Sequence, residues 1–119
     1  MNNEIKKEVL DVLSLDPIKQ KYICRELEQK GIYLDPRILR KYIKDINNDF
    51  IHGKIDFVVI SNKHGTYKSK LEKDIRIFNE NKIKHAKSEL WSAYNVNKRI
   101  EKNKNMSFSE YIEEVCAGE

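Results

Sequence analysis

The stretch Asp35–Asn48, DPRILRKYIKDINN, predicts an amphipathic helix. Asp35 can accept hydrogen bonds from the free backbone N–H groups at a helix start, and Pro36 fits the first helical position. Apolar side chains recur at the i, i+3, i+4, i+7 spacing that gives a helix one buried side; they are Leu39, Tyr42, Ile43 and Ile46. The opposite side carries Arg37, Arg40, Lys41 and Lys44, with Asn47 and Asn48 beyond them. We therefore expect a helix that packs on its own domain and presents four cations outward.

Two shorter helices are predicted before this one. The first covers residues 3–13, with Ile5, Val9, Val12 and Leu13 inward and Lys6 in solvent, and it ends before Pro17. Ile18 then forms a one- or two-residue extended piece. The second helix covers residues 19–30, has Ile23, Cys24 and Leu27 inward, and ends at Gly31. A tight turn at residues 32–34 leads into the third helix, so residues 19–48 match a helix-turn-helix.

The spacing of apolar residues changes from a helical to a strand-like pattern after Asn48. Residues 50–53 are predicted to form a turn. Residues 55–60 are the richest β-forming run in the sequence. Residues 61–65 form a loop that ends in Gly65, and residues 66–68 return as a second strand. Three helices followed by a β-hairpin predict an α+β fold, a winged helix-turn-helix domain over residues 1–69.

A long helix is predicted after the hairpin. Ser69–Glu72 has the S-x-x-E form of a capping box, so this helix should begin at about residue 70. Its apolar stripe continues to Ile100, and the segment assigned to it is 70–105. Its apolar stripe is too long to be buried on the small domain before it, so we expect its far half to pair with a second subunit. The residues expected in this dimer contact are Ile83, Leu90, Ala93 and Ile100. The sequence does not decide whether the helix is interrupted near residues 79–82.

The last segment, residues 106–119, predicts a short acidic amphipathic helix. Ser107–Glu110 repeats the capping box after a linker at residues 102–105. The apolar side chains of the segment are Phe108, Tyr111, Ile112 and Val115. They either pack back on the long helix or dock a partner protein.

The charge of the 119-residue chain is unevenly distributed. The net charge is +4; residues 1–70 carry 14 Lys or Arg against 10 Asp or Glu, whereas residues 71–119 carry nine of each. The excess therefore lies in the N-terminal part, as expected if only that part meets a polyanion. A solvated, Lys-rich surface without such a partner explains the same distribution about equally well.

Several function classes find no support in the sequence. Cys24 and Cys116 are too few and too far apart for a disulfide framework or a Cys-rich zinc site. The three histidines, at 52, 64 and 85, have no i, i+4 partner among themselves, and there is no Gly-rich phosphate loop. We therefore expect no metal, no cofactor and no enzymatic activity. The absence of a signal peptide and of a long apolar run predicts a cytoplasmic protein without a membrane partner.

The order of these elements resembles a known group of proteins. The run Gly53–Tyr67, followed by a Lys-rich long helix, is similar to the small winged-helix proteins encoded by phages and prophages of low-GC Gram-positive bacteria. In that group a hairpin with a Gly-Tyr-type turn follows the recognition helix; the corresponding residues here are Ile60–Tyr67, with Thr66 between Gly65 and Tyr67. The resemblance covers roughly residues 1–100. It implies a phage regulator, a replication accessory or an opponent of host defences, acting in the cytoplasm of a bacterial host cell.

Binding to double-stranded DNA is the leading functional hypothesis. Lys and Arg neutralise phosphates, and Arg or Asn near the start of a helix can read guanine or adenine through two hydrogen bonds. The candidate contacts are Arg37, Arg40, Lys41, Lys44 and Asn47 on the third helix, Lys19 and Lys21 at the start of the second, and Lys63, His64 and Lys68 on the wing. We expect a non-enzymatic DNA-binding protein, a regulator of transcription or a replication accessory, that acts as a homodimer with its helix 35–48 in the major groove.

The alternative hypothesis belongs to another class. Basic faces also occur on winged helices that bind only protein, so the chain can instead be an interaction module of phage origin. Its partner would be a host protein, for instance a defence nuclease of the CRISPR type that it inhibits. In that case the acidic segment with Phe108, Tyr111, Ile112 and Val115 would make the contact, or would occupy a basic surface that normally meets nucleic acid.

Overall fold

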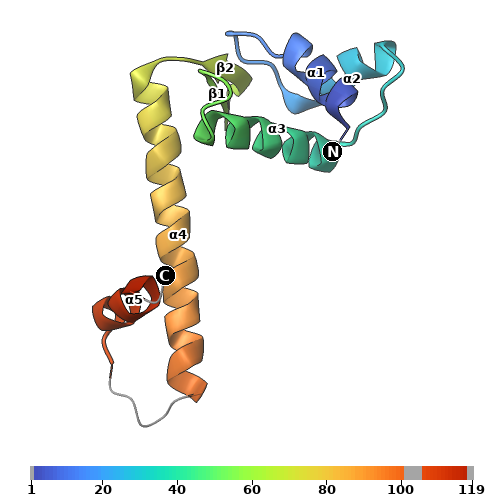
Figure 1. Cartoon of the computed structure of the whole chain (residues 1–119). Helices are drawn as coiled ribbons and strands as arrows, with labels where there is room; N and C mark the ends of the chain where they lie inside the picture. The colour runs from blue at the N-terminus through green and yellow to red at the C-terminus, as the bar shows by residue number, and fades with distance from the viewer. Residues whose placement is uncertain (1, 101–105, 118–119) are drawn as a thin grey trace. The chain divides into compact units, whose positions relative to one another are not determined.

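Residues 2–100 and 106–117 are described by the computed structural model (Figure 1). They form, in order, α1 (Asn3–Val12), α2 (Gln20–Gln29), α3 (Pro36–Ile51), β1 (Val58–Asn62), β2 (Gly65–Ser69), α4 (Glu72–Ile100) and α5 (Phe108–Ala117). The described part is thus α+β, and its order of three helices and a hairpin is compatible with a winged-helix-like arrangement. The chain divides into two compact units, Met1–Phe78 and Asn79–Glu119, and their boundary lies within α4.

The three helices of the first unit enclose one apolar core. Its buried residues are Val9, Leu13, Ile23, Leu27, Leu39, Tyr42, Ile43, Ile46 and Val59. The stripe predicted for α3 is therefore confirmed in full, whereas Ile5, Val12 and Cys24 of the two shorter helices are only partly buried at the core edge. Burial also raises the pKa of the Cys24 thiol, which keeps it protonated at neutral pH.

An ion cluster joins α1 to α3 beside this core. Lys6 was predicted to be solvated, but its Nζ lies 2.8 Å from Asp45 Oδ2 and 2.5 Å from Asp49 Oδ2. Partial burial acts to lower the pKa of Lys6, but the hydrogen bonds with both aspartates outweigh burial and raise it. The hydrogen bond from Lys6 also lowers the pKa of Asp45. The prediction for Lys6 was wrong because α1 packs close enough to α3 for this side chain to reach its two carboxylates.

Helix α3 begins as predicted and ends later than predicted. Asp35 Oδ1 accepts a hydrogen bond from the Ile38 N–H at 2.9 Å, which confirms the predicted N-cap. The helix continues to Ile51 rather than ending at Asn48. Gly53, with φ +74, follows the helix end and supplies the left-handed conformation that often ends helices. Asn47 and Asn48 therefore lie before the last residues of the helix and not at its end.

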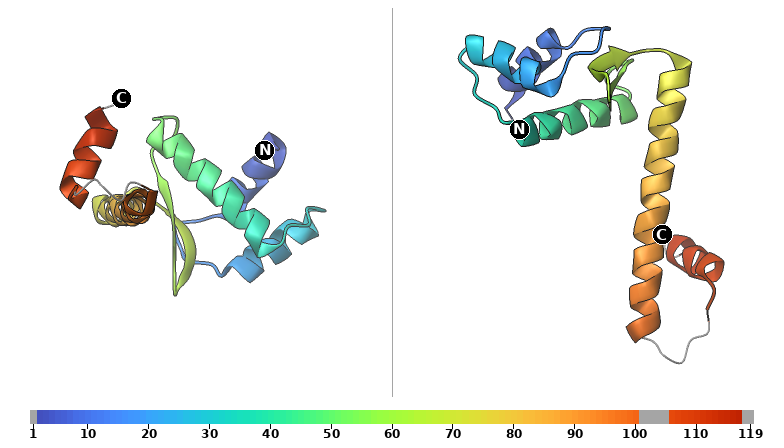
Figure 2. Two further views of the ribbon diagram at one scale, coloured as in Figure 1. Left: turned by 90° about the horizontal axis from the view of Figure 1, so that it is seen from below. Right: turned by 180° about the vertical axis from the view of Figure 1, so that it is seen from behind.

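The hairpin is antiparallel and tightly closed. Its register runs from Val58 opposite Ser69 to Asn62 opposite Gly65, so that two residues, 63 and 64, form the turn. Both strands extend closer to the turn than predicted, and residues 55–57 lead into β1 instead of belonging to it. In both views of Figure 2 the hairpin lies at the C-terminal end of α3. The sequence pattern identified both strands but placed the loop too broadly.

A single-residue β-bridge joins Ile18 to this hairpin. The Ile18 N–H donates to the Thr66 carbonyl at 3.0 Å, and the Thr66 N–H donates to the Ile18 carbonyl at 2.8 Å, which confirms the predicted extended piece. Gly65 makes this approach possible, because a Cβ at this position would lie 2.7 Å from the Ile18 nitrogen. The segment that precedes α2 is thereby joined to β2.

Helix α4 begins at Glu72, and the predicted capping box at its start does not form. Ser69 Oγ donates to Asp74 Oδ2 at 2.6 Å instead of capping with Glu72. Glu72 pairs with Arg76, one helical turn later, at 2.6 Å. The helix continues without a break to Ile100, which answers the question that the sequence left open.

Helix α5 begins after Ser107. The Glu110 N–H donates to Ser107 Oγ at 3.2 Å, as a helix N-cap requires, and this confirms the predicted start. The predicted linker at residues 102–105 lies outside the described residues. Within residues 2–100 and 106–117, no helix is both long and apolar enough to cross a membrane.

Candidate nucleic-acid interface

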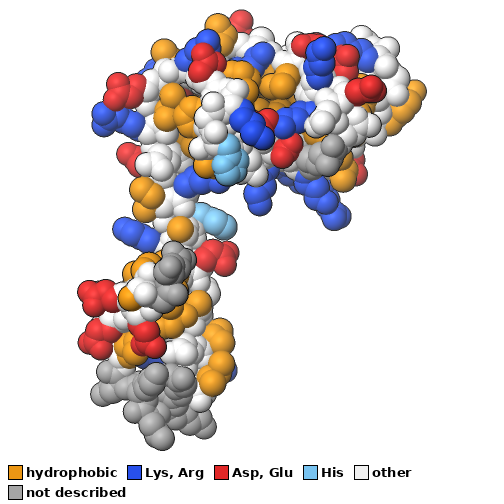
Figure 3. Space-filling view, in the orientation of Figure 1, with side chains coloured by type: hydrophobic (Ala, Val, Ile, Leu, Met, Phe, Trp, Pro, Cys, Tyr) orange, Lys and Arg blue, Asp and Glu red, His pale blue; other side chains and the backbone are white. Residues whose placement is uncertain are grey.

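Four cations line the solvent-facing side of α3. Arg37, Arg40, Lys41 and Lys44 are all exposed, at the i, i+3, i+4, i+7 spacing that places them on one side of the helix. Among the described residues, no carboxylate pairs with any of these four side chains. Lys and Arg side chains project below α3 in Figure 3. This basic side is available to an external anion.

The carboxylates of α3 are not available to neutralise this side. Asp45 follows Lys41 by four residues, a spacing at which a helix can form an ion pair. Its carboxylate is instead engaged by Lys6, which approaches from α1. Asp49 is engaged by the same lysine. The packing of α1 on α3 therefore separates the charges of α3, with the acids paired internally and the cations left to solvent.

Asn47 has a structural role rather than the DNA-reading role that was predicted. Its Oδ1 accepts a hydrogen bond from the Val59 N–H at 2.7 Å, and its Nδ2 donates to the Val59 carbonyl at 3.1 Å. Both ends of the amide are thus bonded to β1, and Val59 itself is buried. Position 47 lies beside the hairpin, and its amide fixes β1 to α3.

The cations of α2 lie on its exposed side. Lys19 Nζ donates to the carbonyl of Lys63 at 2.8 Å, which joins the start of α2 to the turn of the hairpin. Lys21 and Arg25 both lie over the Tyr22 ring, 5.0 and 5.4 Å from its centroid. Both are therefore held over an aromatic face that is itself exposed.

The sequence reasoning did not select Arg25. This side chain lines a surface hollow of about 290 Å³ together with Cys24, Glu28, Tyr33, Leu34 and Asp35. The hollow thus lies where the turn after α2 meets the start of α3, beside the exposed cations of that helix. A signal was present in the sequence, because Arg25 follows Lys21 by one helical turn on α2.

The three predicted wing residues do not share one environment. Lys63 and His64 form the turn and are exposed. Lys68 is only half-exposed, because its Nζ donates to the Leu10 carbonyl at 3.1 Å and lies 5.5 Å from the Phe57 ring centroid. Lys68, a candidate DNA contact on the wing, therefore lies away from the hairpin turn, since the hairpin register places it opposite Val59.

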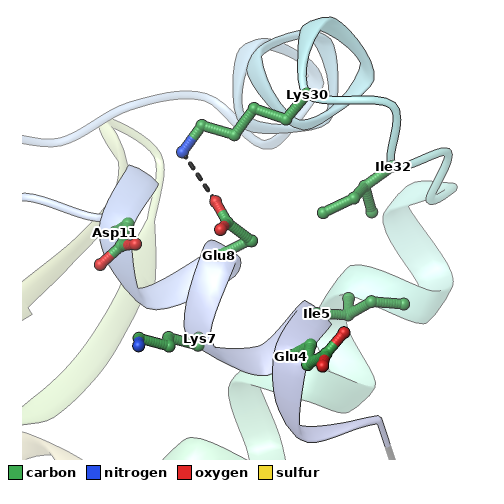
Figure 4. Close-up of a pocket in the computed structure, with 7 residues that line it drawn as sticks. All are labelled: Glu4, Ile5, Lys7, Glu8, Asp11, Lys30 and Ile32. Atoms are coloured by element: carbon green, nitrogen blue, oxygen red, sulfur yellow. Dashed lines mark hydrogen bonds and ion pairs between the residues drawn. The ribbon is translucent and has the colours of Figure 1, made fainter.

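A surface hollow of about 710 Å³ lies elsewhere and has mixed charge (Figure 4). Its lining residues are Glu4, Ile5, Lys7, Glu8, Asp11, Lys30 and Ile32. Lys30 Nζ bonds Glu8 Oε2 at 2.9 Å across it, and this hydrogen bond raises the pKa of Lys30. The three carboxylates of this hollow outnumber its two lysines, and one of the lysines is already paired, so the hollow is a poor site for a polyanion.

The aromatic residues of α5 pack on α4 within the second unit. Phe108 lies 5.1 Å from Trp91 and 5.5 Å from Tyr94, measured between ring centroids. Tyr111 lies 5.7 Å from Tyr94. Of the four side chains proposed for partner binding, Phe108, Tyr111 and Ile112 are half-buried and Val115 is exposed. The interpretation that this segment packs on the long helix is thus the one that the structure supports.

The four residues predicted for dimerisation also differ in exposure. Ile83 and Ile100 are exposed, at 48% and 75% of their surface, and Ala93 is exposed as well. Leu90 is half-buried. These side chains therefore leave an apolar surface on α4 that the residues described in the structure do not cover.

The described residues contain no group of three His, Cys, Asp or Glu side chains that is placed to hold a metal ion. Comparison with known proteins adds no assignment. No protein-family model matches this chain, and neither a curated protein nor a solved structure is similar to it.

Proposed function

We propose that the first unit is a winged helix-turn-helix domain that binds double-stranded DNA through the exposed side of α3. The observation that carries the proposal is the set of four exposed cations on α3 that have no carboxylate partner among the described residues. In this proposal Arg37 and Arg40, near the start of the helix, meet base edges in the major groove. Lys41 and Lys44 meet bases or phosphates.

The supporting residues extend this surface to either side of α3. Lys21 and Arg25 are exposed on α2 and would contact the phosphate backbone, which fixes the orientation of a reading helix. Lys63 and His64 at the hairpin turn would reach the adjacent groove or phosphates. Asn47 and Lys68 form no part of this proposal, since both side chains are bonded within the protein. A non-enzymatic regulator of the phage type is the role that this arrangement fits.

The decisive experiment compares two variants that each remove two positive charges. One is Arg37→Ala with Arg40→Ala; the control is Lys7→Ala with Lys73→Ala, two exposed lysines on α1 and at the start of α4. The probe is a mixed-sequence duplex of about two helical turns, titrated at several salt concentrations. Each lost phosphate contact lowers the slope of log K against log salt by about 0.9.

The arginine variant should bind the duplex at least about tenfold more weakly. On a mixed-sequence duplex without a specific site both arginines contact phosphates instead of base edges, so the salt slope should fall by up to about 1.8. The control should lose far less affinity, because its lysines are not on the α3 surface. Equal losses in the two variants would mean that net charge alone, rather than α3, causes the binding. Failure of the unmodified protein to bind the duplex in dilute buffer would refute the proposal outright.

A further inference from the structure

The second unit has too small a core to account for its compact form. Of its described residues only Tyr94 is buried. That side chain is surrounded by Trp91, Phe108 and Tyr111, and its hydroxyl donates to the Met106 carbonyl at 2.7 Å. Units of roughly 40 residues usually need a disulfide, a metal or a second subunit, because they bury too little apolar surface alone.

Large apolar side chains remain at the surface of this unit. They are Ile83, Trp91, Val96, Ile100 and Val115, with between 41% and 75% of their surface exposed. Trp91 is 51% exposed although its ring already contacts Phe108. Ile83 and Trp91 are two helical turns apart and lie on the same side of α4 as Lys87, midway between them. This strip is thus apolar and basic.

The charges of the two helices are opposite and equal. From residue 79 to residue 100, α4 carries five Lys or Arg and two Glu, which is a net charge of +3. Helix α5 carries Glu110, Glu113 and Glu114 and no basic residue, a net charge of −3. None of these three glutamates forms an ion pair among the described residues. Acidic side chains gather on the α5 side of this unit in Figure 3.

We propose that a second copy of this chain covers the exposed surface of the second unit, with α5 of each copy against the Ile83–Trp91 strip of the other. A two-fold contact uses the same patch on both subunits. A patch that carries an acidic helix and a basic helix is therefore complementary to the same patch on a second copy. The contact buries Trp91 and Val115 and pairs Glu110 and Glu114 with Lys84 and Lys87. The predicted contact paired the long helix with a second subunit through Ile83, Leu90, Ala93 and Ile100. The proposed contact instead sets α5 against the Ile83–Trp91 strip, and it does not depend on DNA binding.

The first test uses Trp91, the single tryptophan of the chain, as a reporter. The full chain is diluted over several decades of concentration while its mass is followed by sedimentation and its tryptophan emission is recorded. We expect a monomer–dimer transition in which the emission moves to shorter wavelength as the dimer forms, since the half-exposed indole becomes covered. A chain that stays monomeric at all concentrations, or a dimer with unchanged emission, would overturn the proposal.

The second test exchanges charges between the two helices. One variant carries Glu110→Lys with Glu114→Lys, and the other carries Lys84→Glu with Lys87→Glu; all four positions are exposed, and circular dichroism checks that both variants fold. Each variant alone should dimerise at least about tenfold more weakly, whereas an equimolar mixture should form a heterodimer, because both contacts then join opposite charges. Undiminished self-association of either variant, or a mixture that does not pair, would overturn the proposal.

Discussion

Replacing Asn47 with leucine should destabilise the first unit, because the amide bonds both backbone groups of Val59. Two hydrogen bonds contribute about 1 kcal/mol each, and a buried N–H left without a partner adds a desolvation cost of about 1–2 kcal/mol. Val59 is 3% exposed, so water does not replace the lost partner. The expected loss in the free energy of unfolding is therefore about 2–4 kcal/mol.

Urea unfolding followed by circular dichroism measures this loss. With a urea dependence of about 2 kcal/mol per molar for a small domain, the midpoint should fall by about 1–2 M. Asn48→Leu is the matched control, because Asn48 is a half-buried neighbour whose side chain forms no hydrogen bond among the described residues. Its midpoint should change little. At low temperature, where Asn47→Leu remains folded, its salt slope for duplex binding should match that of the unmodified protein.

The opposite pattern would refute this reasoning. If Asn47→Leu were as stable as the control but had lost duplex affinity, the amide would be reading DNA and not holding β1. Such a result would also mean that its two bonds to Val59 are not maintained in solution.

Three further changes have defined outcomes. Gly65→Ala should lower the free energy of unfolding by more than about 1 kcal/mol, because φ is +134 and the new Cβ would lie 2.7 Å from the Ile18 nitrogen. Asp35→Ala removes the N-cap of α3 and should cost about 1 kcal/mol, or about 4–8 °C in Tm. The pKa of Asp45 is lowered by Lys6, so its stabilisation is present above the ordinary value of about 3.9 and is lost as the pH falls. Lys6→Met should therefore reduce the fall in urea midpoint between neutral and acidic pH.

Each of these outcomes has a control. Gly53→Ala also has a positive φ but meets open space, so it should cost less than Gly65→Ala; equal costs would show that the close contact is unimportant. Asp35→Asn keeps the accepting oxygen and should retain most of the stability that alanine removes; if it does not, the cap bond is not the cause. Lys7→Met, at an exposed neighbouring position, should leave the acid dependence unchanged, and a pH profile for Lys6→Met equal to it would contradict the ion cluster.

Local patterns predicted the first unit well. The spacing of apolar residues identified the buried side of α3, and Asp35 identified its first turn, since both signals act within one or two turns of helix. The same reasoning found Ile18 as an extended residue and Gly31 as the end of α2. Such features depend on neighbours in the sequence and can be read without the tertiary structure.

The errors arose where partners come from distant parts of the chain. Lys6 and Asn47 look like ordinary surface residues in their own helices, yet their partners lie 43 and 12 residues away. Lys68 was grouped with the two turn residues because the register of the hairpin cannot be read from its strands alone. The exposed cations of α3 were predictable because their position depends only on helix periodicity. The engagement of the α3 carboxylates by a lysine of α1 could not be predicted, because it depends on how the two helices pack.

The bridge between Ile18 and Thr66 makes the hairpin and the first turn of α2 one cooperative unit. Lys19 reinforces it, because its ammonium group bonds the carbonyl at the hairpin turn 2.8 Å away. Swinging the hairpin away from the helices therefore requires these bonds to break together. In hydrogen exchange the amides of Ile18 and Thr66 should open with the same free energy, and Gly65→Ala should raise both exchange rates by a similar factor. A hairpin that exchanged alone would show that it moves independently of α2.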